Sequence, residues 1–160
     1  MKHTIWVVVA DEAIARILER SGDDDELEPV EELTDAAAHA KGQDLRRDAV
    51  GRRSPAGAAG SLGTTGNATA SAGADERHLE ADGFARRVAA HLETAFHAKR
   101  FDELRLVAAP RFLGLLRKQL HPEVAKRVSD SLDKDLVHMV NSDISARVFP
   151  AREGGSGARA

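Results

Sequence analysis

The chain has 160 residues, 23 of them basic and 26 acidic, and a formal net charge of −3. This length suits one domain, and the balanced charge favours neither nucleic acid nor an acidic substrate as the partner. The absence of cysteine excludes disulfides, thiolate zinc sites and thiol nucleophiles, and it agrees with a reducing compartment.

The first apolar run, from Ile5 to Ala10, is six residues long and ends at Asp11 and Glu12. A secretory signal needs an apolar core of about 7–15 residues, and a membrane-spanning helix needs about 20. We therefore expect a soluble cytoplasmic protein that makes no contact with a membrane. Most of this run is β-branched and continuous, which predicts a central strand buried on both faces.

Two further strands are predicted soon after, at Ala15–Glu19 and Leu27–Leu33. Pro29 favours an edge position for the third strand, because proline has no N–H to donate to a neighbouring strand. The connections between the strands are tight, so the three strands together predict an antiparallel meander.

A long segment without apolar periodicity follows, at about residues 41–75. Its first half is basic, and its second half consists mainly of glycine, alanine, serine and threonine. This composition buries too little apolar surface to offset the entropy lost on ordering. We therefore expect a flexible loop here, and a disordered tail at residues 151–160, where Gly154, Gly155 and Gly157 are clustered.

Helices are expected to dominate the second half of the chain. A helix at about residues 76–100 is indicated by four apolar residues at four-residue intervals, which are Phe84, Val88, Leu92 and Phe96. A strand is predicted at Leu104–Ala109. Pro110 is placed to open the next helix, where its missing N–H costs nothing.

Three elements complete the predicted order. They are a short helix at about residues 123–127, a weak strand at 128–132 and a last helix that includes residues 136–144. The predicted fold class is α/β, with a single domain at residues 1–150. A mixed five-stranded sheet with helical cover is expected, in the order β-β-β-loop-α-β-α-β-α.

The junction at Pro110 is the strongest candidate for a binding site. A strand that runs straight into a helix places unpaired N–H groups and the positive end of the helix dipole at the carboxyl edge of the sheet. Such helix ends bind anions, and this helix adds three basic side chains, those of Arg111, Arg117 and Lys118. The alternative is an ordinary amphipathic helix whose basic residues are only solvated.

Other basic residues extend the candidate anion- or RNA-binding set. They are Arg46, Arg47, Arg52 and Arg53 in the loop, and Lys134 after the fifth strand. Basic side chains on a loop can contact phosphates without sequence preference. The alternative is that these charges only keep the loop soluble, as runs of charge usually do.

Enzyme motifs are absent from the sequence. It has no phosphate-binding loop, dinucleotide fingerprint, nucleophile elbow or zinc-spaced histidine pair, so His91 and His138 are expected to be structural. Four acids lie near predicted strand ends, where a nuclease would gather carboxylates around two metal ions, namely Asp11, Asp102, Asp133 and Asp135. These acids equally suit turns and helix caps. We therefore predict no catalytic residue, no metal and no cofactor.

Several segments together carry a family resemblance. They are residues 6–11 (WVVVAD), 15–18 (ARIL), Gly51-Arg52, the long helix with Phe84, residues 107–117 (VAAPRFLGLLR) and 132–136 (LDKDL). In these segments the chain resembles the bacterial host-attachment protein family, over nearly all of residues 3–145. That family is similar to the middle domain of archaeal and eukaryotic peptide-chain release factors and of Pelota, which implies a ribonuclease-H-like sheet.

The resemblance places the loop at about 41–75 where release factors carry a Gly-Gly-Gln that promotes peptidyl-tRNA hydrolysis. The stretch Gly57–Gly73 contains no glutamine, and the nearby Gly42-Gln43 has a single glycine. We therefore expect no peptide release by that chemistry.

These features predict a non-catalytic cytoplasmic protein that binds RNA or the translation machinery. Two alternatives stay open. One is a metal-dependent nuclease or hydrolase that uses Asp11 and Asp135, and the other is an attachment factor that acts through protein contacts of the loop. The sequence leaves the oligomeric state undetermined.

Overall fold

Strand β1 (Thr4–Ala10) lies at the centre of a five-stranded sheet with the order β3-β2-β1-β4-β5. The computed structural model describes residues 2–22, 24–35 and 66–151, with side chains in the last range from Asp75 onward. β1 pairs antiparallel with β2 (Ile14–Ser21) and parallel with β4 (Glu103–Ala108), so the sheet is mixed, as predicted. Every residue of β1 from Trp6 to Ala10 is buried, which confirms the expected central strand.

The two edges of the sheet are β3 (Glu28–Thr34) and β5 (Val128–Leu132). β3 pairs antiparallel with β2, and β5 pairs parallel with β4. Pro29 lies in an edge strand, as predicted. An edge strand pairs on one side only, so a residue without an N–H group is tolerated on its unpaired side. The first three strands therefore form the expected antiparallel meander.

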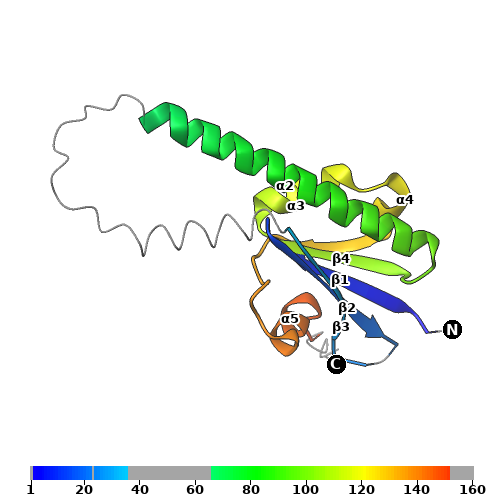
Figure 1. Cartoon of the computed structure of the whole chain (residues 1–160). Helices are drawn as coiled ribbons and strands as arrows, with labels where there is room; N and C mark the ends of the chain where they lie inside the picture. The colour runs from blue at the N-terminus through cyan, green and yellow to red at the C-terminus, as the bar shows by residue number, and fades with distance from the viewer. Residues whose placement is uncertain (1, 23, 36–65, 152–160) are drawn as a thin grey trace, which may run out of the picture.

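Helices cover both faces of this sheet (Figure 1). They are α2 (Gly66–His97), α3 (Pro110–Gln119), α4 (Pro122–Ala125) and α5 (Asn141–Val148). α2, α3 and α4 lie on one face and α5 on the other (Figure 1). Alternate residues of β1 serve the two cores, because Trp6 and Val8 pack with α2 and α3, and Val7 and Val9 pack with α5. One domain with two apolar layers results.

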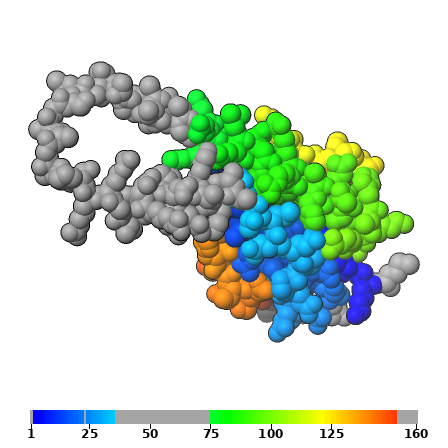
Figure 2. Space-filling view, viewed as in Figure 1, coloured from blue at the N-terminus to red at the C-terminus, as the bar shows by residue number. Residues whose placement is uncertain are grey.

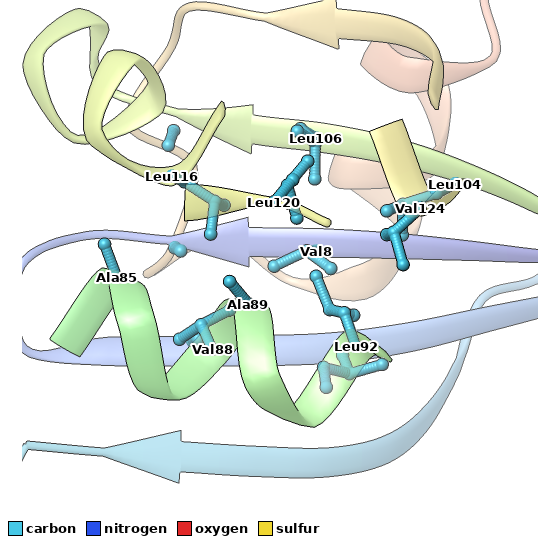
Figure 3. Packing of buried hydrophobic residues seen from close by; sticks show 14 of the residues in the cluster. Val8, Ala85, Val88, Ala89, Leu92, Leu104, Leu106, Leu116, Leu120 and Val124 are labelled. Carbon is cyan, nitrogen blue, oxygen red and sulfur yellow. The ribbon is translucent and has the colours of Figure 1, made fainter. Parts of the chain in front are cut away.

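The larger core lies between the sheet and the helices α2, α3 and α4. Side chains of the three helices converge on β1 and β4 (Figure 3). The predicted apolar stripe of α2 is confirmed, since Phe84, Val88 and Leu92 are buried and Phe96 packs at the margin. The rings of Phe84 and Phe112, with centroids 5.8 Å apart, join α2 to α3.

α2 also lies along the edge strand β3. The space-filling view shows α2 (green) directly above β3 (light blue) (Figure 2). Arg87 donates to the carbonyl of Thr34 at 2.8 Å, and His91 forms an ion pair with Glu31. His91 thus helps to join α2 to β3, and its expected structural role stays a prediction.

The start of α2 differs from the prediction. The helix begins at Gly66 rather than at about residue 76, so residues 66–75 of the expected loop are helical. Four alanines between Ala68 and Ala74 explain the difference, because alanine has the highest helix propensity even where no apolar stripe is present. The other residues of the expected loop, 41–65, lie outside the described ranges with their four arginines Arg46, Arg47, Arg52 and Arg53, and so does the tail from residue 152.

The last helix is shorter than predicted. α5 begins at Asn141, and residues 136–139 form a turn that contains His138. Arg16 of β2 explains the turn, since its guanidinium donates to the carbonyls of Val137 (2.9 Å) and Met139 (2.8 Å). The prediction that His138 lies in the helix was therefore wrong.

Candidate functional site

The junction of β4 and α3 lies beside the end of β1, at the carboxyl edge of the sheet. β1 and β4 are parallel neighbours, so Asp11 and Pro110 follow strands that end at the same edge. A pocket of about 280 Å³ opens there. Its lining residues are Asp11, Glu12, Ala13, Ala109, Arg111, Phe112 and Asp135. The structure thus brings together Arg111 and two of the four predicted acids.

The N-terminus of α3 has the features expected of an anion site, but the charges around it are mixed. Pro110 occupies the first turn, and Ala109 supplies no side-chain cap. Arg111 is exposed and its guanidinium contacts the ring of His78 on α2. The carboxylates of Asp11, Glu12 and Asp135 line the same pocket. A phosphate at this edge would meet both attraction and repulsion.

Two of the four acids singled out from the sequence, Asp11 and Asp102, accept hydrogen bonds from backbone N–H groups. Oδ1 of Asp11 accepts from the N–H groups of Ala13 and Ile14, both at 2.8 Å, and so holds the β1–β2 turn. Asp102 accepts from the N–H of Thr4 at 2.8 Å and lies before β4, at the opposite edge of the sheet from Asp11. Among the residues that the structure describes, no group of three or more acids and histidines could hold a metal ion.

A separation of charge across the sheet is the feature that sequence reasoning missed. Residues 19–35, which run through the end of β2 and all of β3, include nine acidic residues and one basic residue, Arg20. Residues 111–127, which run through α3 and α4, include five basic residues and one acidic residue, Glu123. A charge count over a sliding window would have found both segments, which the net charge of −3 conceals.

The five basic residues of the second segment form what we call the basic ridge. They are Arg111, Arg117, Lys118, Lys126 and Arg127, and all five are exposed. Arg111 and Lys118 are seven residues apart on α3 and therefore share one face of the helix. Within the described ranges, none of the five forms an ion pair with a carboxylate, whereas Arg20, Arg86, Arg87, Arg100 and Arg105 each do.

Gly114 lies between Arg111 and Lys118 on this exposed face of α3. Glycine inside a helix costs about 1 kcal/mol relative to alanine. No packing reason requires it here, since a Cβ atom added at Gly114 would meet nothing within 4 Å. The ridge therefore has bare helix backbone between two of its cations.

Lys134, the remaining predicted site residue, is exposed and follows β5 in a bend. It is next to Asp135 in the chain and does not belong to α3 or α4. Of the four predicted basic residues that the structure describes, three thus lie on one helix and Lys134 is separate from them.

A larger pocket lies on the other face of the sheet, between α5 and the β2–β3 connection. It has a volume of about 830 Å³ and is lined in part by Arg20, Leu27 and Phe149. Arg20 and Arg105 both lie over the ring of Phe149, with their guanidinium carbons 4.3 and 4.2 Å from its centroid. Arg105 also donates to the carbonyl of Val148 in α5, and Arg20 donates to that of Asp24 in the β2–β3 connection, so the two arginines fasten these segments to the sheet.

Glu103, at the start of β4, accepts hydrogen bonds from three side chains. Burial disfavours its ionised form, but the hydrogen bonds from Ser129, His3 and Arg105, with the charge of Arg105, outweigh burial and lower the pKa of its carboxyl. Glu103 therefore fastens β5 and the N-terminal residues to β4.

Comparison with family models gives a match over residues 6–148 to a family described as "Protein required for attachment to host cells". No curated protein matches the chain. Among solved structures, one described as an archaeal protein is similar over 91% of this chain and 36% of its own, with 10% sequence identity and a TM-score of 0.44. The chain thus spans about a third of that protein. None of the described helices is long and apolar enough to cross a bilayer.

Proposed function

We propose that this chain, which belongs to the family of proteins required for attachment to host cells, is a non-catalytic domain that binds RNA through its basic ridge. One observation carries the proposal: five exposed cations lie close together in the chain, three on α3 and two directly after α4, and no described carboxylate pairs with them. The family resemblance expected from the sequence is confirmed by the match, but the match itself names no ligand.

A polyanion is the partner that such a surface favours. Each phosphate that is neutralised releases a condensed counterion, so several basic side chains together give binding that weakens steeply with salt. The nine acidic residues between positions 19 and 35 would repel the same polyanion. Repulsion on one side of the protein and attraction on the other would orient the RNA toward α3 and α4.

The bare backbone at Gly114 supports the same partner. A position without a side chain lets a phosphate approach the helix between Arg111 and Lys118. Any side chain longer than a methyl group would stand between the two cations. Gly114 thus lowers the stability of α3, although the packing of the protein does not require a glycine there.

The likeness to the release-factor middle domain is also part of this proposal, and so is a cytoplasmic location on ribosomes. The likeness was expected from the resemblance to the host-attachment family, and the cytoplasmic location from the short apolar run at Ile5–Ala10 and the absence of cysteine. They lead to RNA of the translation machinery as the first ligand to test.

The test is binding of labelled single-stranded RNA and co-sedimentation with ribosomes, each at low and high salt. We expect the double variant Arg117→Glu/Lys118→Glu to lose affinity about ten-fold or more at low salt, with a shallower dependence on salt. Lys2→Glu/Arg147→Glu is the matched control, because it changes the charge equally at exposed sites away from the ridge. Equal losses in the two variants, or no binding by the wild type, would refute the proposal.

A hydrolase remains a second candidate because Asp11, Asp135 and Arg111 share one pocket. A metal-dependent nuclease would place its carboxylates at such a strand edge. RNA cleavage that requires a divalent metal and is abolished by Asp11→Asn would support it. Asparagine keeps the acceptor that holds the β1–β2 turn, so the variant tests the charge rather than the fold. An attachment role through the loop at about 41–75 depends largely on residues outside the described ranges and stays a prediction.

A further inference from the structure

The C-terminal end of α2 carries a cluster of rings and cations beside the basic ridge. Phe96 and His97 end the helix, and their ring centroids are 5.7 Å apart. The ring of His121, at the start of α4, lies 6.3 Å from that of His97, and the guanidinium of Arg127 lies over Phe96 at 5.3 Å. With Lys99, these residues make up what we call the α2-end cluster.

Aromatic rings in this cluster are open to solvent. The side chain of His97 is 58% exposed, and Phe96 and His121 are half-buried. The neighbouring cations Lys99 and Arg127 are exposed and have no carboxylate partner among the described residues. Exposed rings beside unpaired cations are what an unstacked nucleic-acid strand requires, because bases stack on the rings and phosphates bind the cations.

Lys99 provides an independent observation. Its φ of 55° makes it the one non-glycine residue with positive φ in the part of the chain described. The N–H of Lys99 donates to the carbonyl of Phe96, and the N–H of Arg100 donates to that of Ala95, at 2.9 and 3.0 Å. This pair of bonds is a Schellman motif, in which the left-handed position usually holds glycine.

A lysine at this position costs conformational free energy that glycine would avoid. Charge at the end of a helix dipole does not explain the lysine, because Arg100 follows it and supplies that charge with an ordinary backbone. Arg100 is also held by the fold, since it lies over Trp6 and pairs with Glu31. The ammonium group of Lys99 is therefore free for a partner outside the chain.

We propose that the α2-end cluster takes unpaired bases of a single-stranded RNA, which stack on His97 and His121 while Lys99 and Arg127 hold the flanking phosphates. This inference rests on the proposed function and adds where the bases bind and which form of RNA is bound. A duplex keeps its bases stacked on one another and cannot offer them to these rings. The cluster also adjoins Lys126, so one strand can follow the basic ridge and end on the rings.

Lys99→Gly gives the sharpest test. Relief of the left-handed backbone raises the midpoint of thermal unfolding by about 2–4 °C, whereas affinity for a single-stranded RNA falls several-fold. The slope of log affinity against log salt falls by about 0.7, as expected for one lost phosphate contact on a single strand. A merely structural lysine would give the gain in stability without the loss of binding. Lys99→Asn, which tolerates the same backbone, is expected to lose binding to the same extent.

The rings are tested by the pair His97→Gln and His121→Asn. Asparagine at position 121 keeps an acceptor for the N–H of Glu123, which His121 Nδ1 accepts at 3.2 Å. We expect each variant to lose about five-fold or more in affinity for a single-stranded RNA, and to lose nothing for an abasic strand of the same length. The wild type should also prefer the single strand to a duplex of equal length.

The outcomes separate this inference from the proposed function. If the wild type binds no RNA, the proposed function fails. If Arg117→Glu/Lys118→Glu loses binding while Lys99→Gly and the two histidine variants bind as the wild type does, the ridge stands and the α2-end cluster is refuted. Equal losses of the histidine variants for the RNA and the abasic strand would refute base stacking.

Discussion

The basic ridge and the acidic β3 side of the molecule differ in whether their charged side chains form ion pairs within the fold. On the β3 side, Glu31 pairs with His91 and Arg100, and Arg20 pairs with Asp25, so much of the charge is satisfied within the fold. On the ridge, the five cations have no carboxylate partner in the described ranges. The pairing of charges, rather than the net charge, distinguishes a surface that holds the fold together from one available to a partner.

The largest expected effect on stability comes from Arg16, a cation whose guanidinium is held by three hydrogen bonds within the fold. Arg16→Ala removes the donors that hold two carbonyls and Asn141, the last at 2.6 Å, and leaves these acceptors partly buried. The free energy of unfolding should fall by about 2–4 kcal/mol. Arg117→Ala on the ridge should change it by no more than about 0.5 kcal/mol. Denaturant unfolding of both variants checks this difference, and equal losses would erase the distinction between the two kinds of cation.

A smaller effect is expected at Gly114. Gly114→Ala should stabilise the protein by about 0.5–1 kcal/mol, because the helix gains propensity and the new methyl group meets nothing. Gly114→Glu should lower RNA affinity, since it places a carboxylate between Arg111 and Lys118. Thermal unfolding and RNA titration measure the two effects. If Gly114→Glu binds RNA as tightly as the wild type, the RNA strand does not cross the exposed face of α3.

The smallest effect concerns pH. Because the folded pKa of Glu103 lies below its ordinary value of 4.5, ionised Glu103 stabilises the fold above that pH, and this contribution is lost as pH falls through the folded pKa. Glu103→Gln should therefore flatten the acid side of the stability curve by a few tenths of a kcal/mol, which suits a partly exposed group. Unfolding midpoints at pH 3–6 check the sign, and a steeper acid limb in the variant would contradict it.

Local patterns predicted those parts of the fold that local chemistry decides. The apolar run of β1, the edge position of Pro29 and the helix start at Pro110 each follow from neighbouring residues in the chain. The start of α2 at Gly66 escaped prediction because alanine-rich segments form helices without an apolar stripe. The turn at residues 136–139 escaped it because its cause, Arg16, lies about 120 residues earlier.

The same limit applies to the candidate site. Arg111, Arg117 and Lys118 were predicted because they belong to one helix that follows one strand. The α2-end cluster combines residues from the end of α2, the start of α4 and Arg127, and only the packing of those elements brings them together. The backbone strain at Lys99 has no pattern in the sequence, since a lysine after a helix is ordinary.

The placement of β1 between an antiparallel and a parallel neighbour has a consequence for the order of folding. Its antiparallel partner is five residues away at the turn, where Ala10 pairs with Ala15, whereas Ile5 must wait for Glu103. Closing the short turn between β1 and β2 costs little entropy. Closing the long loop between β1 and β4 costs more, and this entropy is lost before the contacts between the two strands can offset it. We infer that the meander forms first and leaves unpaired the backbone N–H and C=O groups of β1 that later pair with β4. Pulsed hydrogen exchange during refolding would show amides of β2 protected before those of β4. Until then, that open edge is where a growing chain is most exposed to mispairing.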